Sequence, residues 1–224
     1  MIKNWIFIFL ICIPGLLVLL WLGSWQLQRL VWKENLISEI STRLGSVPGE
    51  MPLSPTSKNH NYFMTNIDGK IQSDRIHVLT STRKIGPGFR VISPVILKDG
   101  RSILIDRGII PEKDKDLSLG LGGNNITGYL LWPNETDYFT PEPNFKKNIW
   151  FARDLEKMAN FLKTEKVLIV ATKLRQVPNF NIQDPTINIP NNHLQYAITW
   201  FLMGGLWLAM SIYFFFKNVR KRKD

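Results

Sequence analysis

Two long runs without charged side chains, one near each end of the chain, restrict the fold more than any other feature. Residues 5–25 and 194–216 contain no Asp, Glu, Lys or Arg. A helix that rises ~1.5 Å per residue crosses a hydrocarbon core of ~30 Å in about 20 residues. The sequence therefore predicts a first transmembrane helix over residues 5–27, a second over residues 194–216, and a domain outside the bilayer over residues 28–192.

The short segment after the second run sets the expected orientation. Residues 217–224 hold one anion and five cations, which are Lys217, Arg220, Lys221, Arg222 and Lys223. Cationic segments that flank membrane helices stay on the cytoplasmic side. We therefore expect a basic cytoplasmic tail, both termini in the cytoplasm and an extracytoplasmic domain between the helices.

Two cations oppose this orientation. Arg29 and Lys33 follow the first run on its outer side, where Glu34 and Glu39 partly offset their charge. The tail cluster is larger, so the predicted orientation stands and Arg29 calls for a functional reason.

A cleaved signal peptide is the competing interpretation of the first run. Its apolar part exceeds the usual ~7–15 residues, and the segment 23–25 (GSW) is a poor cleavage site, so a retained anchor is favoured. No Arg- and Ser-rich transit segment precedes it, which favours a bacterial protein. We expect a multi-pass protein of the bacterial cytoplasmic (inner) membrane with a periplasmic central domain.

Composition excludes several function classes. Cys12 is the one cysteine, so the chain has neither an internal disulfide nor a CxxC pair. Of the net charge of +10, the eight-residue tail holds +4, and the +4 of residues 30–192 is diluted over a whole domain, which argues against a nucleic-acid partner. GxSxG, HExxH and P-loop motifs are missing, and the sequence holds three histidines, so no enzyme is expected.

The central region alternates in the manner of β-strands. Strands are predicted over residues 75–80, 89–97, 101–110, 124–132 and 166–174, with a hairpin turn at 98–100. Residues 30–46 have helical spacing and should continue the first membrane helix. Residues 47–61, rich in proline, read as an extended connection.

One helix interrupts the strands. Asp154 is a suitable N-cap, and apolar residues follow it at helical spacing: Leu155, Met158, Ala159 and Leu162. We expect an α+β domain with a mainly antiparallel sheet closed into a barrel-like core. Asp99 and Asp106 are interpreted as turn and strand-end residues.

The outer ends of the two predicted membrane helices carry the candidate binding residues: His193, Tyr196 and Trp200 on the second, and Trp25 and Arg29 on the first. An aromatic belt at the membrane interface is one interpretation. A pocket for a flat apolar ligand with anionic groups is the other, in which His193 ligates iron, indoles stack on a macrocycle and Arg29 pairs with carboxylates. Small residues that would let the helices approach are Gly205 with Ala209, and Gly15 with Gly23.

Four ordered motifs resemble the Surfeit locus protein one family, whose members are membrane proteins needed to assemble cytochrome c oxidase. They are GSWQLQRLVWKENLI (23–37), GFRVISPVILKDGRSILIDRGIIP (88–111), FTPEPN…WFARDL (139–155) and NNHLQYAITWF (191–201). This chain departs at Ile109, where the family usually has Trp, and at residues 203–204 (MG), where it usually has Leu-Ala.

The resemblance implies a non-enzymatic assembly factor that binds heme a and assists its insertion into subunit I of cytochrome c oxidase. It implies His193 as the heme-iron ligand; heme a synthase is a further expected partner beside the lipid bilayer. Trp25, Arg29, Tyr196 and Trp200 as pocket walls rest on helix geometry alone. Two other hypotheses stay open: a scaffold that binds oxidase subunits without heme, and a catalytic step in heme chemistry.

Overall fold

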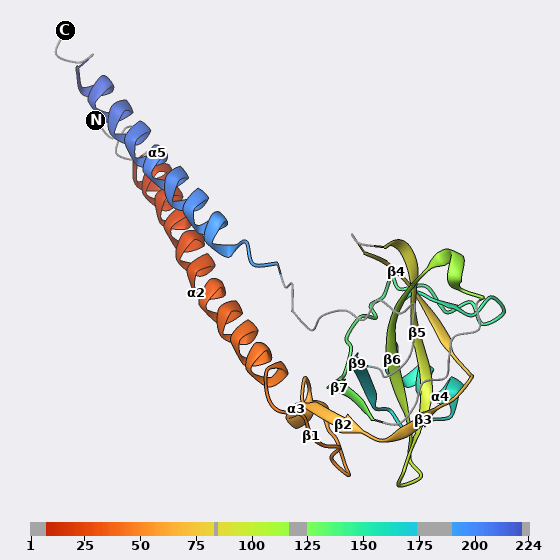
Figure 1. Ribbon diagram of the computed structural model, residues 1–224. Helices are drawn as coiled ribbons and strands as arrows, with labels where there is room; N and C mark the ends of the chain where they lie inside the picture. Colours follow the sequence, from red (N-terminus) through yellow and green to blue (C-terminus); the bar gives the residue numbers. More distant parts are fainter. Residues whose placement is uncertain (1–7, 83–84, 117–124, 174–189, 221–224) are drawn as a thin grey trace. The chain divides into compact units, whose positions relative to one another are not determined.

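A computed structural model describes residues 8–82, 85–116, 125–173 and 190–220. The chain divides into two compact units, Met1–Glu39 with Ile187–Asp224, and Ile40–Thr186. The first unit is the helix pair, formed by the π-helical turn η1 (Ile8–Cys12), most of α2 (Ile13–Leu44) and α5 (His193–Arg220). The second is the β domain (Figure 1).

Both long helices are apolar and exposed. The candidate spans are Phe9–Leu44 and His193–Lys217. The most apolar 18-residue stretch of each has a mean hydropathy of 1.9 and 1.6, respectively, and 11% and 6% of these stretches is buried. A core helix of a soluble protein would be mostly buried, so these helices are those of a two-span membrane protein. The first helix continues to Leu44 without a break, as predicted. The boundaries at which the helices leave the membrane stay predictions.

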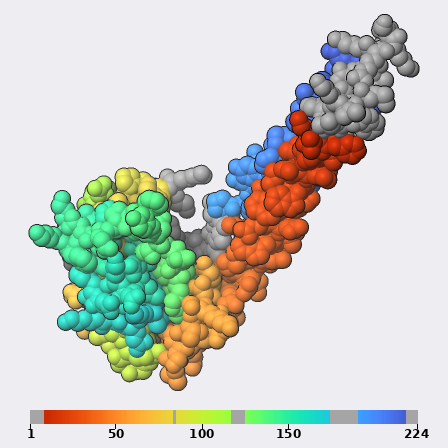
Figure 2. Space-filling view, turned by 180° about the vertical axis from the view of Figure 1, so that it is seen from behind, coloured from red at the N-terminus to blue at the C-terminus, as the bar shows by residue number. Residues whose placement is uncertain are grey.

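The two helices run antiparallel and lie side by side, as Figure 2 shows from outside, and each packs against the other along one stripe. The buried or half-buried positions recur every three or four residues, which is the spacing of paired helices. On η1 and α2 they include Cys12, Leu16, Leu19, Gly23 and Gln26; on α5 they include His193, Ala197, Trp200, Gly204, Trp207 and Ser211.

Glycines set the closeness of this packing. A Cβ atom on Gly23 would lie 2.8 Å from the Phe201 ring, and one on Gly15 would lie 2.8 Å from the Trp207 ring. The predicted role of Gly205 is wrong, because nothing lies within 4 Å of its Cβ position. Gly204 is the buried α5 glycine instead, at one of the two positions that depart from the family pattern.

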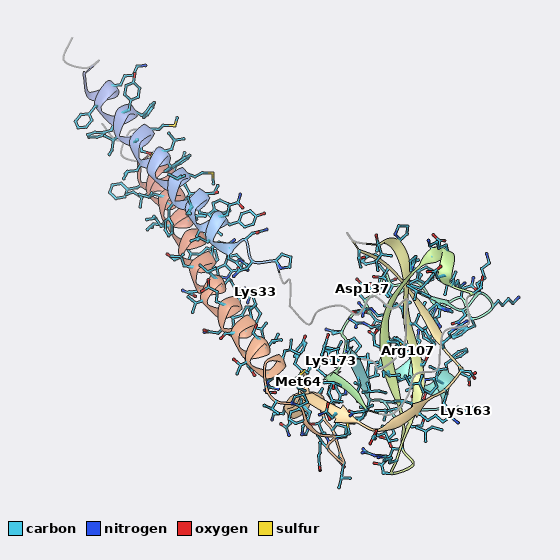
Figure 3. All side chains as sticks on the ribbon, viewed as in Figure 1. Lys33, Met64, Arg107, Asp137, Lys163 and Lys173 are labelled. Atoms are coloured by element: carbon cyan, nitrogen blue, oxygen red, sulfur yellow. The ribbon has the colours of Figure 1, made fainter. Side chains whose placement is uncertain are left out.

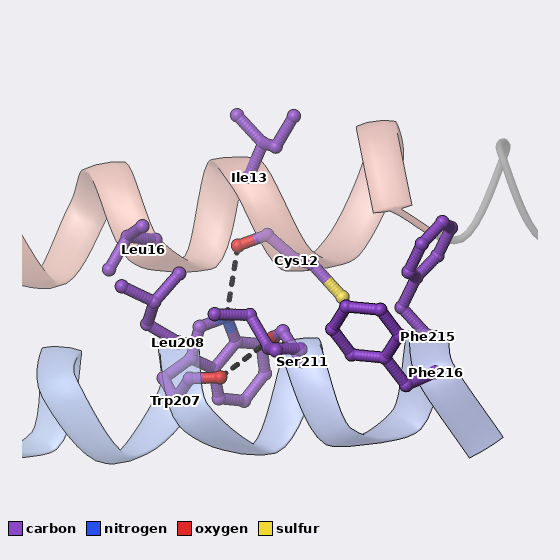
Figure 4. Close-up of a pocket in the computed structure, with 9 residues that line it drawn as sticks. Cys12, Ile13, Leu16, Trp207, Leu208, Ser211, Phe215 and Phe216 are labelled. Carbon is purple, nitrogen blue, oxygen red and sulfur yellow. Dashed lines mark hydrogen bonds between the residues drawn. The ribbon is translucent and has the colours of Figure 1, made fainter.

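One hydrogen bond joins the helices near Pro14. The Trp207 indole Nε1 donates to the carbonyl oxygen of Cys12 at 2.9 Å (Figure 4). Cys12 ends the π-helical turn that precedes Pro14. The neighbouring helix thus donates a hydrogen bond to a carbonyl near the irregular part of the first membrane helix.

The β domain contains one mixed sheet in the order β1-β2-β7-β9-β6-β5-β4-β8, with β3 also paired to β5. Its elements are β1 (Gly49–Glu50), α3 (Ser57–His60), β2 (Met64–Ile67), β3 (Gly69–Ile71), β4 (Ile76–Thr82), β5 (Gly86–Leu97), β6 (Ser102–Pro111), η2 (Glu112–Asp114), β7 (Ile126–Leu131), β8 (Ile149–Trp150), α4 (Leu155–Leu162) and β9 (Leu168–Lys173). The pairs β1–β2, β4–β8 and β6–β9 are parallel and the other five are antiparallel.

The sheet closes on itself into the expected barrel. β2 pairs with β7, and β3, which follows β2 after Asp68, pairs with β5, four strands along the path from β2. The ring is therefore β2/β3-β7-β9-β6-β5. Alternate residues of these strands fill its interior, including Ile67, Ile71, Val95, Ile105, Leu130 and Ile169.

Helix α4 covers an outer face of the barrel. The Asp154 carboxylate accepts a hydrogen bond from the Lys157 N–H at 3.0 Å, which confirms the predicted cap. Met158 and Ala159 pack against Trp150, Leu104 and Leu168, residues that face away from the barrel interior.

The bounds of β4, β6, β7 and β9 agree with the predicted strands within two residues, and β5 begins three residues before its predicted start. β2, β3 and the short helix α3 were not predicted, and α3 interrupts the segment expected to be extended. β2 and β3 are short and separated by Asp68, which hides their alternation.

Candidate functional site

His193 is the first residue of α5 and faces α2. Its ring Nδ1 lies 2.7 Å from Oε1 of Gln26, a residue 167 positions earlier in the chain. Both side chains are half-buried, and Ala197, one turn further along α5, is 1% exposed. Close helix packing thus holds the imidazole against an amide at the end of the helix pair where α5 begins.

Trp200 shares the interhelical stripe of α5 with His193, seven residues away, and is half-buried. Tyr196 lies beside that stripe and is 55% exposed. The structure therefore places His193 and Trp200 on one face toward α2, with Tyr196 at its border.

Trp25 and Arg29 form a separate cluster on α2. The guanidinium carbon of Arg29 lies 4.7 Å from the Trp32 ring centroid and 6.0 Å from that of Trp25. Successive helical residues point ~100° apart, so with Gln26 facing α5, Trp25 projects sideways, and it is 42% exposed. These cation–π contacts suit the membrane interface, and a shared pocket with His193 stays a prediction.

Cations beside this end of the pair are Arg29 and Lys33, the latter labelled on α2 in Figure 3. Arg29 is exposed while it stacks on indoles, so its N–H groups remain accessible to an anionic ligand. Arg29 therefore lies against two indole rings, and the pairing of Arg29 or Lys33 with ligand carboxylates stays a prediction.

Two apolar grooves flank the helix pair toward its other end. One of about 510 Å³ is lined by Cys12, Trp207 and neighbouring residues (Figure 4), and one of about 550 Å³ by Gly15, Met203 and others. Neither is lined by His193 or by the other four predicted site residues. Both grooves therefore lie apart from the candidate site.

A buried charge cluster lies in the β domain. Asp106 is 0% exposed; its carboxylate is 2.7 Å from the Arg90 guanidinium and 3.4 Å from that of Arg153, and it accepts a 3.0 Å bond from the Gly108 N–H. Arg153 also pairs with Glu135. The prediction of Asp106 as a simple strand-end residue is wrong, because it lies within β6 and neutralises two arginines that the sequence places far away.

The charges of this cluster act on the buried phenol of Tyr129. Burial raises its pKa to about 12, and the negative charge of Asp106 adds to the increase. The phenol is therefore protonated at neutral pH, and the cluster holds paired charges rather than a free acid or base. Its arrangement supports a structural role.

The helix pair offers one imidazole, that of His193, as a candidate metal ligand. The described residues contain no group of three or more His, Cys, Asp or Glu side chains that could hold a metal. A heme iron needs one imidazole nitrogen on a given side, and His193 with Nδ1 engaged has Nε2 left for this. Asn191 Oδ1, two residues before His193, is buried without a hydrogen-bond partner in the part of the chain that the structure describes.

These features define a membrane protein whose two helices flank a mixed β domain and hold a histidine where they meet. Comparison with known proteins agrees. The model of the SURF1 family matches residues 15–205. Surfeit locus protein 1 of Gallus gallus is 31% identical over 89% of this chain and 72% of its own length; the Homo sapiens protein is 30% identical over 89% and 73%.

The Surfeit locus protein 1 of Takifugu rubripes is 28% identical over 96% of this chain and 98% of its own length, so the likeness spans helices and β domain alike. The chain belongs to the SURF1 family. This is a family of cytochrome c oxidase assembly factors and is not known as an enzyme family, so the chain associates with the oxidase during its assembly.

Gln26 is the site residue that sequence reasoning missed. It stands just beyond the first apolar run, where a polar residue is ordinarily interfacial. Its spacing of three residues from Gly23 and seven from Leu19 was the available signal, because it continues the small and apolar stripe that faces α5.

Proposed function

We propose that this chain holds heme a at the outer membrane edge of the helix pair and assists its delivery to subunit I of cytochrome c oxidase. His193 Nε2 is the proposed iron ligand. The observation that carries the proposal is the His193–Gln26 contact at 2.7 Å, which fixes an imidazole between two membrane helices. A bound heme supplies an iron centre that accepts a nitrogen lone pair.

The residues around His193 have distinct proposed tasks. Trp200 and Tyr196 supply apolar and aromatic surface beside the imidazole, and Trp25 adds an exposed indole on α2. Arg29 offers its guanidinium to the heme carboxylates. A single bond from His193 to the iron, together with the exposed side chains beside it, would hold the heme and still allow its release to the oxidase.

The proposed setting is the bacterial inner membrane, with both termini cytoplasmic and the β domain periplasmic. The cations of residues 217–224 support this orientation. The helix end with His193 then lies at the periplasmic face. Heme a synthase is the proposed source of the ligand, and subunit I is its proposed recipient.

Heme delivery is tested in cells that lack this chain and are complemented with wild-type or His193→Ala protein. The purified oxidase should contain less heme a per subunit I with His193→Ala than with wild type. Equal heme a content at equal protein levels would refute delivery through His193.

A second candidate function is a scaffold that binds the oxidase through the β domain. Tyr138 and Phe139 favour it: they are 94% and 85% exposed at the tip of a turn, where Asp137 accepts hydrogen bonds from the Phe139 N–H and the Thr140 hydroxyl. Figure 3 labels Asp137 in this loop. Ordered exposed aromatic residues are frequent anchors of protein interfaces.

Substitutions in the exposed loop distinguish the scaffold function from heme binding. Replacing Tyr138 and Phe139 with serine should reduce co-purification of the oxidase and leave heme content unchanged if both functions coexist. Unchanged co-purification would remove the support that this loop gives to the scaffold.

A further inference from the structure

Gln26 and His193 make a close polar contact between the two helices, which directs attention to the tautomer of the imidazole. The acceptor atom facing Nδ1 is an amide oxygen, Oε1, at 2.7 Å. An amide oxygen has no proton to give, so the hydrogen must stand on Nδ1. A neutral imidazole carries one N–H, and its lone pair is then on Nε2.

We propose that Gln26 is a positioning residue that fixes His193 in the Nδ1–H tautomer and so presents Nε2 as the ligating nitrogen. The inference rests on the proposed heme function for its purpose, although the tautomer itself is a property of the ligand-free protein. Neutral histidine in water favours the opposite tautomer, which has the proton on Nε2. In that tautomer Nε2 has no free lone pair and cannot ligate a metal. An acceptor at Nδ1 reverses this preference.

The two helices are closely packed beside Gln26. Gly23, one turn earlier, lets the Phe201 ring approach to 2.8 Å from the position of a Cβ atom, so the two helices are close at this level. Ala197 is 1% exposed on the facing helix. Ser24, the nearest hydroxyl on α2, is engaged with the Leu20 carbonyl at 2.8 Å and does not compete for the imidazole.

A histidine that ligates a metal is ordinarily oriented by a hydrogen bond from its other ring nitrogen, and loss of that partner weakens binding about 10- to 100-fold. Gln26 supplies this partner from the other helix. The ligating atom is therefore set by helix packing, and any change that parts the helices at Gly23 also frees the imidazole.

The first test uses ligand-free protein. Full-length chain labelled with ¹⁵N-histidine in detergent contains three histidines, and His193→Ala identifies the resonances of His193. Wild type should show His193 protonated at Nδ1. Gln26→Leu should shift the population at least fivefold toward Nε2–H, whereas Gln28→Leu, a control at an exposed position of the same helix, should not. A wild-type Nε2–H tautomer, or no change in Gln26→Leu, overturns the inference.

The second test uses hemin as the probe. Gln26→Leu should weaken hemin binding about tenfold, while Gln26→Glu, which keeps an acceptor oxygen, should restore it and alter the spectrum of the iron–imidazole complex. Helix content equal to that of wild type shows that each variant is folded. If His193→Ala binds hemin as well as wild type, the proposed function fails while the tautomer experiment still decides the role of Gln26. If only His193→Ala loses binding, the role of Gln26 is refuted and the proposed function stands.

Discussion

A buried histidine in the β domain should make the stability of this protein fall at mildly acidic pH. His77 lies on β4, is 4% exposed and meets the Phe89 ring edge at a centroid distance of 5.7 Å. Burial lowers its pKa from 6.5 to about 4, and the positive charges of Arg75 and Lys115 contribute, while Asp116 opposes them. The folded protein therefore keeps His77 neutral where the unfolded chain protonates it.

The direction and size follow from proton linkage. Below pH 6.5 the unfolded state binds a proton that the folded state does not, so stability falls as pH drops from 6.5 toward 4. A difference of about 2.5 pKa units between the two states costs about 3 kcal/mol once the pH reaches 4, at ~1.4 kcal/mol per unit. Between pH 7.5 and pH 5 the loss from this residue is about 2 kcal/mol.

This loss is measured by unfolding the full chain with denaturant in detergent. Circular dichroism monitors the unfolding of the β domain. His77→Leu removes the titrating group and leaves His60 and His193 in place, so their contributions cancel between the two proteins. The stability of wild type should fall about 2 kcal/mol more than that of His77→Leu between pH 7.5 and pH 5. Parallel pH profiles, within about 0.5 kcal/mol, would refute the assignment of a neutral buried His77.

Three further predictions concern single contacts. Asp106→Asn removes the carboxylate that faces Arg90 and Arg153 and should lower the unfolding free energy by about 3 kcal/mol in the same denaturant assay; a loss below about 1 kcal/mol would contradict its buried pairing. Asp154→Ala removes the α4 cap and should cost about 1 kcal/mol, with Asp99→Ala as an exposed-turn control; equal effects would deny the cap. Gly23→Leu should part the helices at Phe201 and reduce a cross-link between cysteines introduced on the facing helices, whereas Gly205→Leu, with open space around it, should not; similar losses would refute the packing.

The sequence predicts most of this fold where local pattern and burial agree. The strands over 89–97 and 101–110 have long apolar alternation and a Gly100 turn, and Asp154 precedes a helix with regular spacing, so each was found within three residues. β2 and β3 were missed because they are short and Asp68 separates them. Their pairing with β7 and β5 closes the barrel through contacts that local patterns do not encode.

The candidate site shows the same division. His193 stands out in the sequence because a lone histidine begins an apolar run, and the family resemblance adds weight to it. Gln26 does not stand out, since its partner is 167 positions away and helix pairing alone brings them together. Trp25 and Arg29 were grouped with His193 by membrane depth, but depth does not determine the helix face, and their observed contacts are with each other and Trp32.

Heme content of the purified chain tests the central claim most directly. Wild type produced in cells that make heme a, then purified in detergent, should show a Soret band and a heme a pyridine hemochrome spectrum. His193→Ala should lose most of this heme, while His60→Ala, at the end of the short helix α3, should retain it. A wild-type protein without a Soret band, or equal heme content in wild type and His193→Ala, would contradict heme ligation by His193.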